Sequence, residues 1–587
     1  MKLPLVAVLA AAGLSFTMAT TKPAFASQVQ PSVLGPAPAL QRVHFTVHLP
    51  LRNEPELDAL LASQAKQGSP LYHHFLTPAQ FAAAYGPTRA DLAAAASPLR
   101  AAGFAVRPTP HGLAVTGNAN QVSHMFNAQV NSVRTREGRI TTALTGRPTL
   151  PASLSALGAV VPAFSGVSRR ETDSERSFKR VPDNRYSPFG PYWFDDLKEA
   201  YQFPSYLALN GRGSTVATVI SSDFSDADLA QYMHHEKLPV PKTYRRIVDG
   251  GHPFDPNSGD SFEADLDIQQ LAGIAPGATV ADYEIPDLSD QSMYDAYAAV
   301  DDDNKVDVVN SSFGGCELYY TPAYNGGQNF TFILKANDQL FKQGNAQGIT
   351  FTASSGDRGN YECQDPSQTH YIRGVGFPAD SPRVTAVGGT NLVTEYTAPF
   401  KSHLDSGYIR ESEYADHRKG LPNSIWGSGG GQSVIFPRPS YQALVGYKSA
   451  GRGIPDLSLQ MGGCPSDVID PKRCSPDDSA SIEAFAGQLF GVIGTSISSP
   501  DFAGLIGLEV QYSGSRQGNV NPEAYYLARL GSYKGNKFYH NSIPGNNGYR
   551  TTAGYNLVVG NGSVIARNFI EAFNLPVAGD PQTPTNP

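Results

Sequence analysis

Short apolar stretches alternate with longer segments of helical periodicity along most of the chain. The strand-like stretches lie at 215–220, 278–283, 306–310 and 349–353, and a helix-like segment spans 329–347. Strands that are apolar on both faces and separated by helices are typical of a parallel sheet covered by helices on both sides. We therefore predict an α/β fold for this region, with functional residues at the carboxyl ends of the strands.

The N-terminal part of the chain has a mixed pattern. Residues 43–49 alternate like a strand, and 54–66 and 89–102 have helical periodicity. We expect a separate compact α+β unit over residues 42–165. Residues 168–180, which follow it, are charged and almost free of apolar side chains. This composition predicts an exposed linker that is open to proteolysis.

The first 26 residues have the pattern of a signal peptide. Lys2 precedes an apolar segment at 3–18, and the small-residue site at 24–26 predicts cleavage after Ala26. A membrane anchor is the alternative, but Pro4 interrupts the segment and no later stretch is long enough to span a bilayer. We predict an exported, soluble protein whose polar end, 575–587, is disordered.

The Gly-Thr-Ser-x-Ser-x-Pro string at 494–500 joins a strand-like run at 489–493 to a helix-like segment at 502–508. This arrangement holds Ser496 at the start of a helix. Its hydroxyl would point out of the fold, and the free amides of the helix N-terminus would favour developing negative charge. The alternative is an ordinary capping serine.

A serine nucleophile needs a neighbouring base, and none of the 13 histidines lies in a setting typical of one. The stretch 263–276 offers carboxylates instead. In a helix, Glu263 and Asp267 share one face while Asp265 points away. Two acids in contact titrate as a unit, and one of them keeps a proton. The alternative is a solvated acidic face near a helix N-terminus.

Residues 348–359 form a buried strand candidate that ends in a Ser-Gly-Asp turn at Asp357. An aspartate can donate a hydrogen bond to an oxyanion only while it is protonated. If Asp357 has this role, the protein prefers acid. The alternative is a turn aspartate that makes a local hydrogen bond.

Together, these three motifs resemble the sedolisin family of serine-carboxyl peptidases. The strings at 377–379, 387–390, 428–431 and 452–456 are also similar to that family. The resemblance implies a subtilisin-like parallel sheet sandwiched by helices. It also implies that Ser496 is the nucleophile, Glu263 the general base, Asp267 its orienting partner and Asp357 the oxyanion donor.

The segment 69–78 resembles the sedolisin propeptide, a pro-kumamolisin activation domain with a ferredoxin-like α+β fold. We expect a chain of five parts, in order: a signal peptide at 1–26, a propeptide domain at 27–165, a processing linker at 166–190, a peptidase domain at 191–574 and a disordered tail at 575–587.

The resemblance also implies a calcium site near the C-terminus, and the sequence departs from it. The two aspartates that the family uses read as Asn541, beside Ser542, and as Asn556. Calcium affinity depends on the number of carboxylate charges around the ion. We therefore expect no strong calcium site, no other cofactor, and a stability that does not respond to a chelator.

The chain has four cysteines, which in an exported protein suggests two disulfides with three possible connectivities. We favour Cys316 with Cys363 and Cys464 with Cys474. A zinc site is the rival, but the spacings match no usual one.

The net charge is −8, yet basic residues outnumber acidic ones in 28–180. A basic prosegment complements an acidic enzyme at neutral pH, and acid would weaken that attraction. The alternative is an uneven charge distribution without function.

We predict a secreted proenzyme that activates itself at low pH and hydrolyses peptide bonds through an acyl-enzyme on Ser496. Endopeptidase action is the first expectation, a tripeptidyl exopeptidase the second, and a catalytically silent extracellular binding protein the alternative from another class. The expected partners are protein or peptide substrates and the chain's own propeptide, as intramolecular inhibitor and chaperone. We expect a monomer that binds neither nucleic acid nor membrane.

Overall fold

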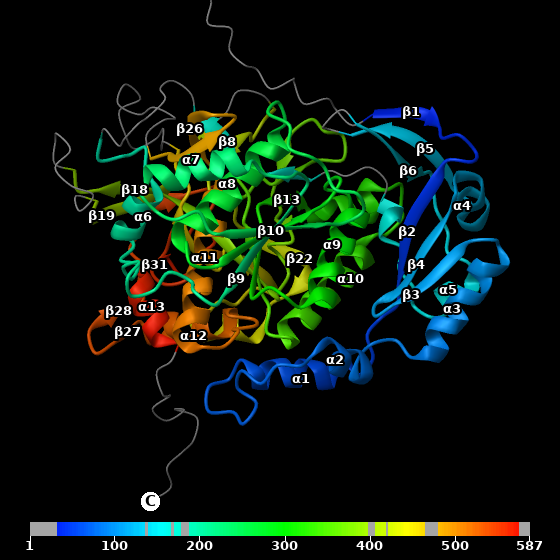
Figure 1. Cartoon of the computed structure of the whole chain (residues 1–587), viewed down its shortest axis with the longest axis horizontal. Helices are drawn as coiled ribbons and strands as arrows, with labels where there is room; N and C mark the ends of the chain where they lie inside the picture. Colours follow the sequence, from blue (N-terminus) through cyan, green and yellow to red (C-terminus); the bar gives the residue numbers. More distant parts are fainter. Residues whose placement is uncertain are drawn as a thin grey trace, which may run out of the picture.

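The computed structural model describes residues 32–135, 139–165, 170–177, 187–396, 406–417, 421–463 and 479–573. An N-terminal α+β region packs beside a larger α/β region (Figure 1). The expected signal peptide and tail lie outside the described residues, as do Cys464 and Cys474.

The α/β region is built on a long sheet whose strand order is β10-β11-β9-β12-β14-β18-β24-β31-β29. Neighbouring strands from β10 to β31 run parallel, and β29 pairs antiparallel with β31. The strands are β9 (Thr215–Ile220), β10 (Lys242–Ile247), β11 (Thr279–Glu284), β12 (Val308–Ser311), β14 (Thr350–Ser354), β18 (Val384–Thr394), β24 (Leu457–Gln460), β29 (Tyr539–His540) and β31 (Ser563–Val564). The four strands expected from apolar runs are confirmed, as β9, β11, β12 and β14.

Helices cover both faces of this sheet, as the alternating pattern predicts. Helices α8 and α11 pack against each other on one face, and α9 and α10 lie on the other (Figure 1). The helices of this region are α6 (Phe194–Ala200), α7 (Asp226–His235), α8 (Gly259–Ile274), α9 (Asp290–Asp303), α10 (Thr331–Ala346), α11 (Thr495–Ser513), α12 (Asn521–Leu530) and α13 (Ala566–Ala572). The fold is therefore the predicted subtilisin-like α/β sandwich.

The N-terminal region contains two small antiparallel sheets, with orders β1-β5-β6 and β2-β4-β3. The elements are β1 (Ser32–Pro36), β2 (Arg42–His48), α1 (Glu54–Gln64), α2 (Pro78–Ala84), α3 (Arg89–Ala101), β3 (Ala105–Thr109), β4 (Gly112–Asn118), α4 (Ala119–Phe126), β5 (Gln129–Arg134) and β6 (Ile140–Thr145). Apart from α1 and α2, which are inserted after β2, the elements β2, α3, β3, β4, α4 and β5 follow the βαββαβ order of a ferredoxin-like unit, with β5 paired to β1 and β6 in the second sheet. The predicted α+β prodomain is confirmed.

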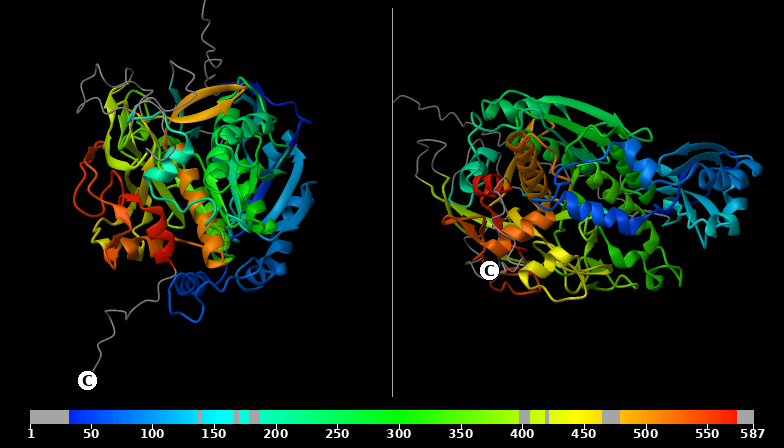
Figure 2. Two further views of the ribbon diagram at one scale, coloured as in Figure 1. Left: turned by 60° about the vertical axis from the view of Figure 1, so that its left-hand side comes forward. Right: turned by 90° about the horizontal axis from the view of Figure 1, so that it is seen from below.

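This prodomain packs on α9 and α10, and α1 and α2 run along the lower edge of the α/β region (Figures 1 and 2). His48 of β2 shares hydrogen bonds with the hydroxyl of Tyr294, at 2.6 Å, and with the side-chain oxygen of Gln339, at 2.9 Å. Lys342 of α10 pairs with Glu54 at 2.9 Å and Asp58 at 3.1 Å. One apolar cluster continues from the prodomain into the α/β region.

Residues 170–177 do not form the exposed linker that their composition predicts. The short strands β7 (Glu171–Thr172) and β8 (Glu175–Ser177) pair antiparallel with β13 (Phe313–Cys316) and β26 (Gln488–Ile493). Arg170 is only 5% exposed and Asp173 only 4%. The prediction is wrong here because strands on both sides satisfy the backbone and a buried carboxylate pairs with the arginine.

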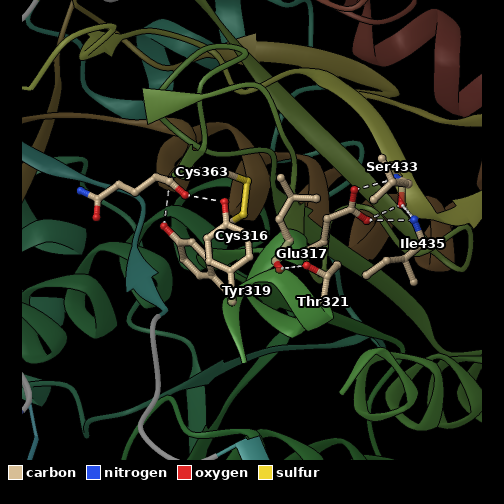
Figure 3. Close-up of a disulfide and its surroundings, with 11 residues drawn as sticks. Cys316, Glu317, Tyr319, Thr321, Cys363, Ser433 and Ile435 are labelled. Atoms are coloured by element: carbon tan, nitrogen blue, oxygen red, sulfur yellow. Dashed lines mark hydrogen bonds between the residues drawn. A yellow bond between two sulfur atoms is a disulfide. The ribbon is translucent and has the colours of Figure 1, made fainter. Parts of the chain in front are cut away.

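The predicted disulfide between Cys316 and Cys363 is present, with a Cα–Cα distance of 5.2 Å (Figure 3). It ties the end of β13 to the start of the short strand β15 (Cys363–Gln364). Next to it, the buried Glu317 accepts hydrogen bonds from the Ser433 hydroxyl at 2.5 Å and the Val434 amide at 2.7 Å. These contacts fix β13, which lines the segment 170–177.

Candidate active site

Helix α8 carries the predicted carboxylate pair. It begins after Ser258, whose hydroxyl caps the first amides, so residues 263 and 267 lie in the second and third turns. Glu263 and Asp267 are fully buried and on one face. Asp265 points elsewhere and accepts a hydrogen bond from the Ser225 amide at 2.7 Å. The alternative of a solvated acidic face is wrong, because the whole helix is buried.

The carboxylate of Asp267 is held by two hydroxyls. Thr218 of β9 donates to one oxygen and Ser312, just after β12, to the other, both at 2.5 Å. Burial raises the pKa of Asp267 to about 7, and the hydroxyls act in the opposite direction. Neither hydroxyl residue is among the site residues predicted from the sequence. The signal for Ser312 is its place at the carboxyl end of a parallel strand.

Glu263 links the buried acid pair on α8 to the predicted nucleophile, Ser496. One of its oxygens accepts a hydrogen bond from the Ser174 hydroxyl, and the other has no hydrogen-bond partner among the described residues. Burial, and then the nearby Asp267, hold the pKa of Glu263 well above its usual range. The hydrogen bond from Ser174, and then the nearby hydroxyl of Ser496, act against this rise.

Ser496 lies in the first turn of α11, directly after a sharp turn. Gly494 has a φ of 141°, and a Cβ there would come within 2.3 Å of the Asp173 carbonyl oxygen, so only glycine fits. The Ser496 amide donates to that same carbonyl oxygen at 3.1 Å. The Ser496 hydroxyl lies 3.4 Å from the carbonyl oxygen of Ser312 and is fully buried beneath residues 173 and 174.

Asp357 lies in the loop after β14 and faces the same carbonyl. Its Oδ1 accepts from the amide of Thr495 at 2.8 Å and from the hydroxyl at 2.9 Å, so it is not a local turn aspartate. Oδ2 has no hydrogen-bond partner among the described residues. A Cβ added at Gly494 would lie 2.8 Å from Asp357 Oδ2 and 2.3 Å from the carbonyl oxygen of Asp173. These two oxygens therefore both lie close to Gly494.

The pKa of Asp357 lies well above its usual range, because the carboxyl is buried and the Asp173 carboxyl is nearby. A protonated Oδ2 can donate a hydrogen bond to a carbonyl oxygen in that position. The structure thus places Glu263, Asp357 and Ser496 around the peptide unit between residues 173 and 174, with Asp267 next to Glu263 on α8. The arrangement offers a hydroxyl, a buried acid pair and two donors for an oxyanion.

The residues at the expected calcium position do not fit the ion. Asn541 and Ser542 are exposed. The side-chain nitrogen of Asn556 donates to the carbonyl oxygens of Thr552 and Gly554, at 3.3 and 3.2 Å. These two carbonyl oxygens are therefore occupied by an amide donor. A calcium site would instead need several oxygens that all point toward the ion.

Among the described residues, none of the helices combines the length and apolar character that crossing a membrane requires.

Comparisons with known proteins agree with this geometry. The family model described as Pro-kumamolisin, activation domain, matches residues 30–165, and the Subtilase family model matches residues 199–524. Sedolisin from Pseudomonas sp. (strain 101) is 28% identical over 574 residues, or 92% of this chain and 88% of sedolisin. Kumamolisin from Bacillus sp. (strain MN-32) is 28% identical over 581 residues, or 93% of this chain and 94% of kumamolisin.

A solved structure gives the same result. It is titled as Pseudomonas sedolisin, a serine-carboxyl proteinase, complexed with two molecules of pseudo-iodotyrostatin. It matches with a TM-score of 0.54 and 25% identity, over 66% of this chain and 97% of that chain. The protein described here is a serine-type peptidase that belongs to the subtilase family, within its sedolisin group, and it is made with a pro-kumamolisin activation domain.

Proposed function

We propose that this protein is an exported endopeptidase that acts in acid, with Ser496 as its nucleophile. The observation that carries the proposal is the path of the chain's own segment 170–177. It runs in extended form across the site, paired with strands on both sides of Ser496. A polypeptide in this position is held as a substrate would be.

In the proposed reaction, the Ser496 hydroxyl attacks the carbonyl carbon while the ionised form of Glu263 takes its proton. Asp267 orients Glu263 and tunes its pKa, and is itself held by Thr218 and Ser312. The Ser496 amide and protonated Asp357 stabilise the oxyanion. Glu263 returns the proton to the leaving amine, and a water molecule then hydrolyses the acyl-enzyme by the same route.

Endopeptidase action is favoured over tripeptidyl release by the depth of the cleft on the acyl side. If the attacked carbonyl belongs to residue 173, Arg170 is the fourth residue on the acyl side of the cut peptide bond. Its side chain is buried against Asp290 and Tyr320. Release of tripeptides requires a cleft that is closed behind the third residue. A cleft that receives a fourth residue is open there, which favours internal cleavage.

Acid dependence is supported by two features. Asp357 donates only when protonated, and its raised pKa keeps it so at moderately acidic pH. At the prodomain interface, burial lowers the pKa of His48 to about 4. The docked prodomain therefore binds fewer protons than the free one, and its docking weakens as pH falls from about 6.5 through about 4.

The decisive experiment is hydrolysis of a denatured protein by purified wild type and Ser496→Ala over roughly pH 2.5 to 8, which spans carboxyl and histidine titration. We expect activity confined to acid that falls by about 10⁴-fold or more in the variant. A substrate labelled at both ends distinguishes internal cleavage from release of tripeptides. Activity that peaks near neutral pH would contradict the carboxyl mechanism. A wild type without activity at any pH would favour the silent binding protein.

A further inference from the structure

We propose that the chain cuts itself between Asp173 and Ser174, and that this bond is selected by a subsite for the Asp173 side chain and a second subsite for the Arg170 side chain. The inference rests on the proposed function, because it names the first substrate of the same site. It also defines the substrates that the freed enzyme prefers: an aspartate or asparagine before the cut bond and an arginine three residues further back.

The backbone of residue 173 identifies the bond. Its amide donates to the Ser312 carbonyl oxygen at 3.3 Å, and its own carbonyl oxygen accepts from the Ser496 amide at 3.1 Å. On the acyl side, Thr172 pairs with Phe313. On the amine side, Glu175 pairs with Ile493, the residue before the Gly494 turn.

The residue after the bond lies against the proposed base. The Ser174 hydroxyl donates to Glu263, and its Cα lies 2.8 Å from the position of a Cβ at Gly494. The leaving amine therefore forms beside the group that must protonate it. Among residues 170–177, only the carbonyl of Asp173 is described with a hydrogen bond from the Ser496 amide.

The first subsite holds the Asp173 side chain. Its Oδ2 accepts a hydrogen bond from the Ser354 hydroxyl at 2.6 Å, and the Gly314 Cα stands close enough that a Cβ there would lie 3.5 Å from Oδ2. The pocket is small and closed, since the residue is 4% exposed. Burial raises the pKa of Asp173 to about 7, so the side chain is neutral in acid. Asparagine has the same shape and is neutral at every pH.

The second subsite holds the Arg170 side chain. The guanidinium donates to the carboxylate of Asp290 and, at 2.5 Å, to the hydroxyl of Tyr320, and it lies 6.0 Å from the ring centre of Phe377. Both charged side chains are 2% exposed. A buried carboxylate without its cation is costly, so this subsite selects for arginine at that position.

The cleavage is an ordinary hydrolysis of a peptide bond through an acyl-enzyme. Ser496 Oγ forms an ester with the Asp173 carbonyl carbon, the Asp173–Ser174 C–N bond breaks, and the proton passes through Glu263 to the amine of Ser174. Water then cleaves the ester. The products are a prosegment that ends in the carboxylate of Asp173 and a mature chain that begins with Ser174.

The first test follows purified proform by intact mass after acidification, at the earliest time points so that later trimming is separated. We expect both new ends at the 173/174 bond, with a rate that does not depend on protein concentration. Asp173→Asn should process within about threefold of wild type, and Asp173→Lys at least about tenfold more slowly. Primary ends outside this bond, with normal hydrolysis of a denatured protein, would overturn this inference alone. Loss of both activities would instead refute the proposed function.

The second test uses the activated enzyme on the peptide Arg-Glu-Thr-Asp-Ser-Glu-Arg-Ser, the sequence of residues 170–177. Replacing its first residue with glutamine should lower kcat/KM at least about tenfold. In Asp290→Asn the two peptides should differ by less than about threefold, because the subsite charge is gone. The matched control is Asp303→Asn, in the same helix but paired with Arg246, which should keep the preference.

An unchanged arginine preference in Asp290→Asn would overturn the second subsite. If that variant does not fold, the same question is put to Arg170→Gln in the proform, where the subsite is intact. Processing of Arg170→Gln at the wild-type rate would then overturn it.

Discussion

Asp357 shows how a single protonation state can decide whether a site works. Its Oδ1 accepts two hydrogen bonds from Thr495, and Oδ2 lies near the same point at Gly494 as the carbonyl oxygen that would be attacked. Because burial raises the pKa of this carboxyl, the donor form persists in acid and is lost as pH rises through the raised pKa. Asp357 can therefore act as an oxyanion donor only at a pH where its carboxyl is protonated.

This role predicts different results for two substitutions. Asp357→Ala should lower kcat about 100- to 1000-fold in acid, where the protonated wild-type carboxyl is an oxyanion donor. Asp357→Asn should lose less and should extend activity to higher pH, since an amide donates without a proton from solution. The check is a kcat profile between roughly pH 3 and 8. An alkaline limb that stays in place in Asp357→Asn would assign that limb to another group.

At the scale of single residues, the sequence predicts the carboxyls and the serine of the site, but not the two hydroxyl residues that hold Asp267. Glu263 and Asp267 follow from helical spacing, and Ser496 from a turn before a helix. Ser312 and Thr218 come from separate strands, and they meet Asp267 only because β9 and β12 are neighbours in the sheet. No local pattern along the chain encodes such a meeting.

At the scale of elements, apolar periodicity predicts the strands and helices well because each buries a continuous face. The expected strand at 215–220 coincides with β9, and the expected helix at 329–347 contains α10. Composition fails for residues 170–177, which are polar yet partly buried. Their burial depends on hydrogen bonds and an ion pair supplied by β13, β26 and Asp290, and these partners are distant in sequence.

The loop around Asn556 is an element whose cohesion depends on an amide. Its side-chain oxygen accepts from the amides of Val558 and Val559, at 3.0 and 3.1 Å, while its nitrogen donates to two carbonyls. One neutral side chain therefore satisfies donors and acceptors on both sides of the turn. These hydrogen bonds hold the loop together across the turn.

We predict that a chelator leaves the Tm of the proform unchanged within about 1 °C, because the hydrogen bonds of Asn556 can close this loop without a bound ion. Asn556→Asp should lower stability by about 1–3 kcal/mol in the presence of chelator, since two carbonyls lose their donor. Thermal unfolding with and without calcium measures both effects. A large fall in the Tm of the wild type on chelation would mean that calcium is bound after all.

At the scale of the whole molecule, carboxyls with raised pKa values extend far beyond the cleft. Burial raises the pKa of Asp265 to about 9 and that of Glu413 to about 8. Asp301 is fully buried, with neither oxygen hydrogen-bonded among the described residues, and its pKa is also raised by burial. His48 and His540, whose pKa values burial lowers to about 4, act in the opposite sense, but the raised acids prevail in number.

The sign of the resulting pH dependence follows from proton binding. An unfolded aspartate releases its proton near pH 4, whereas the buried acids keep theirs to about pH 7 for Asp267 and about pH 9 for Asp265. Between these limits the folded state binds more protons, so its free energy of unfolding falls as pH rises. The fold is therefore most stable in acid, where the proposed chemistry also operates.

Urea unfolding of the Ser496→Ala proform, which cannot process itself, tests this prediction at roughly pH 4.5 and 7.5, on either side of the Asp267 and Asp173 transitions. We expect the higher midpoint at the lower pH. Adding Asp301→Asn, which keeps the shape and removes the ionisation, should raise the midpoint at the higher pH and leave it nearly unchanged at the lower. Equal midpoints for the parent at both pH values would mean that the buried acids ionise without cost. Any preference of the activity for acid would then have to come from the site alone, and not from the stability of the molecule around it.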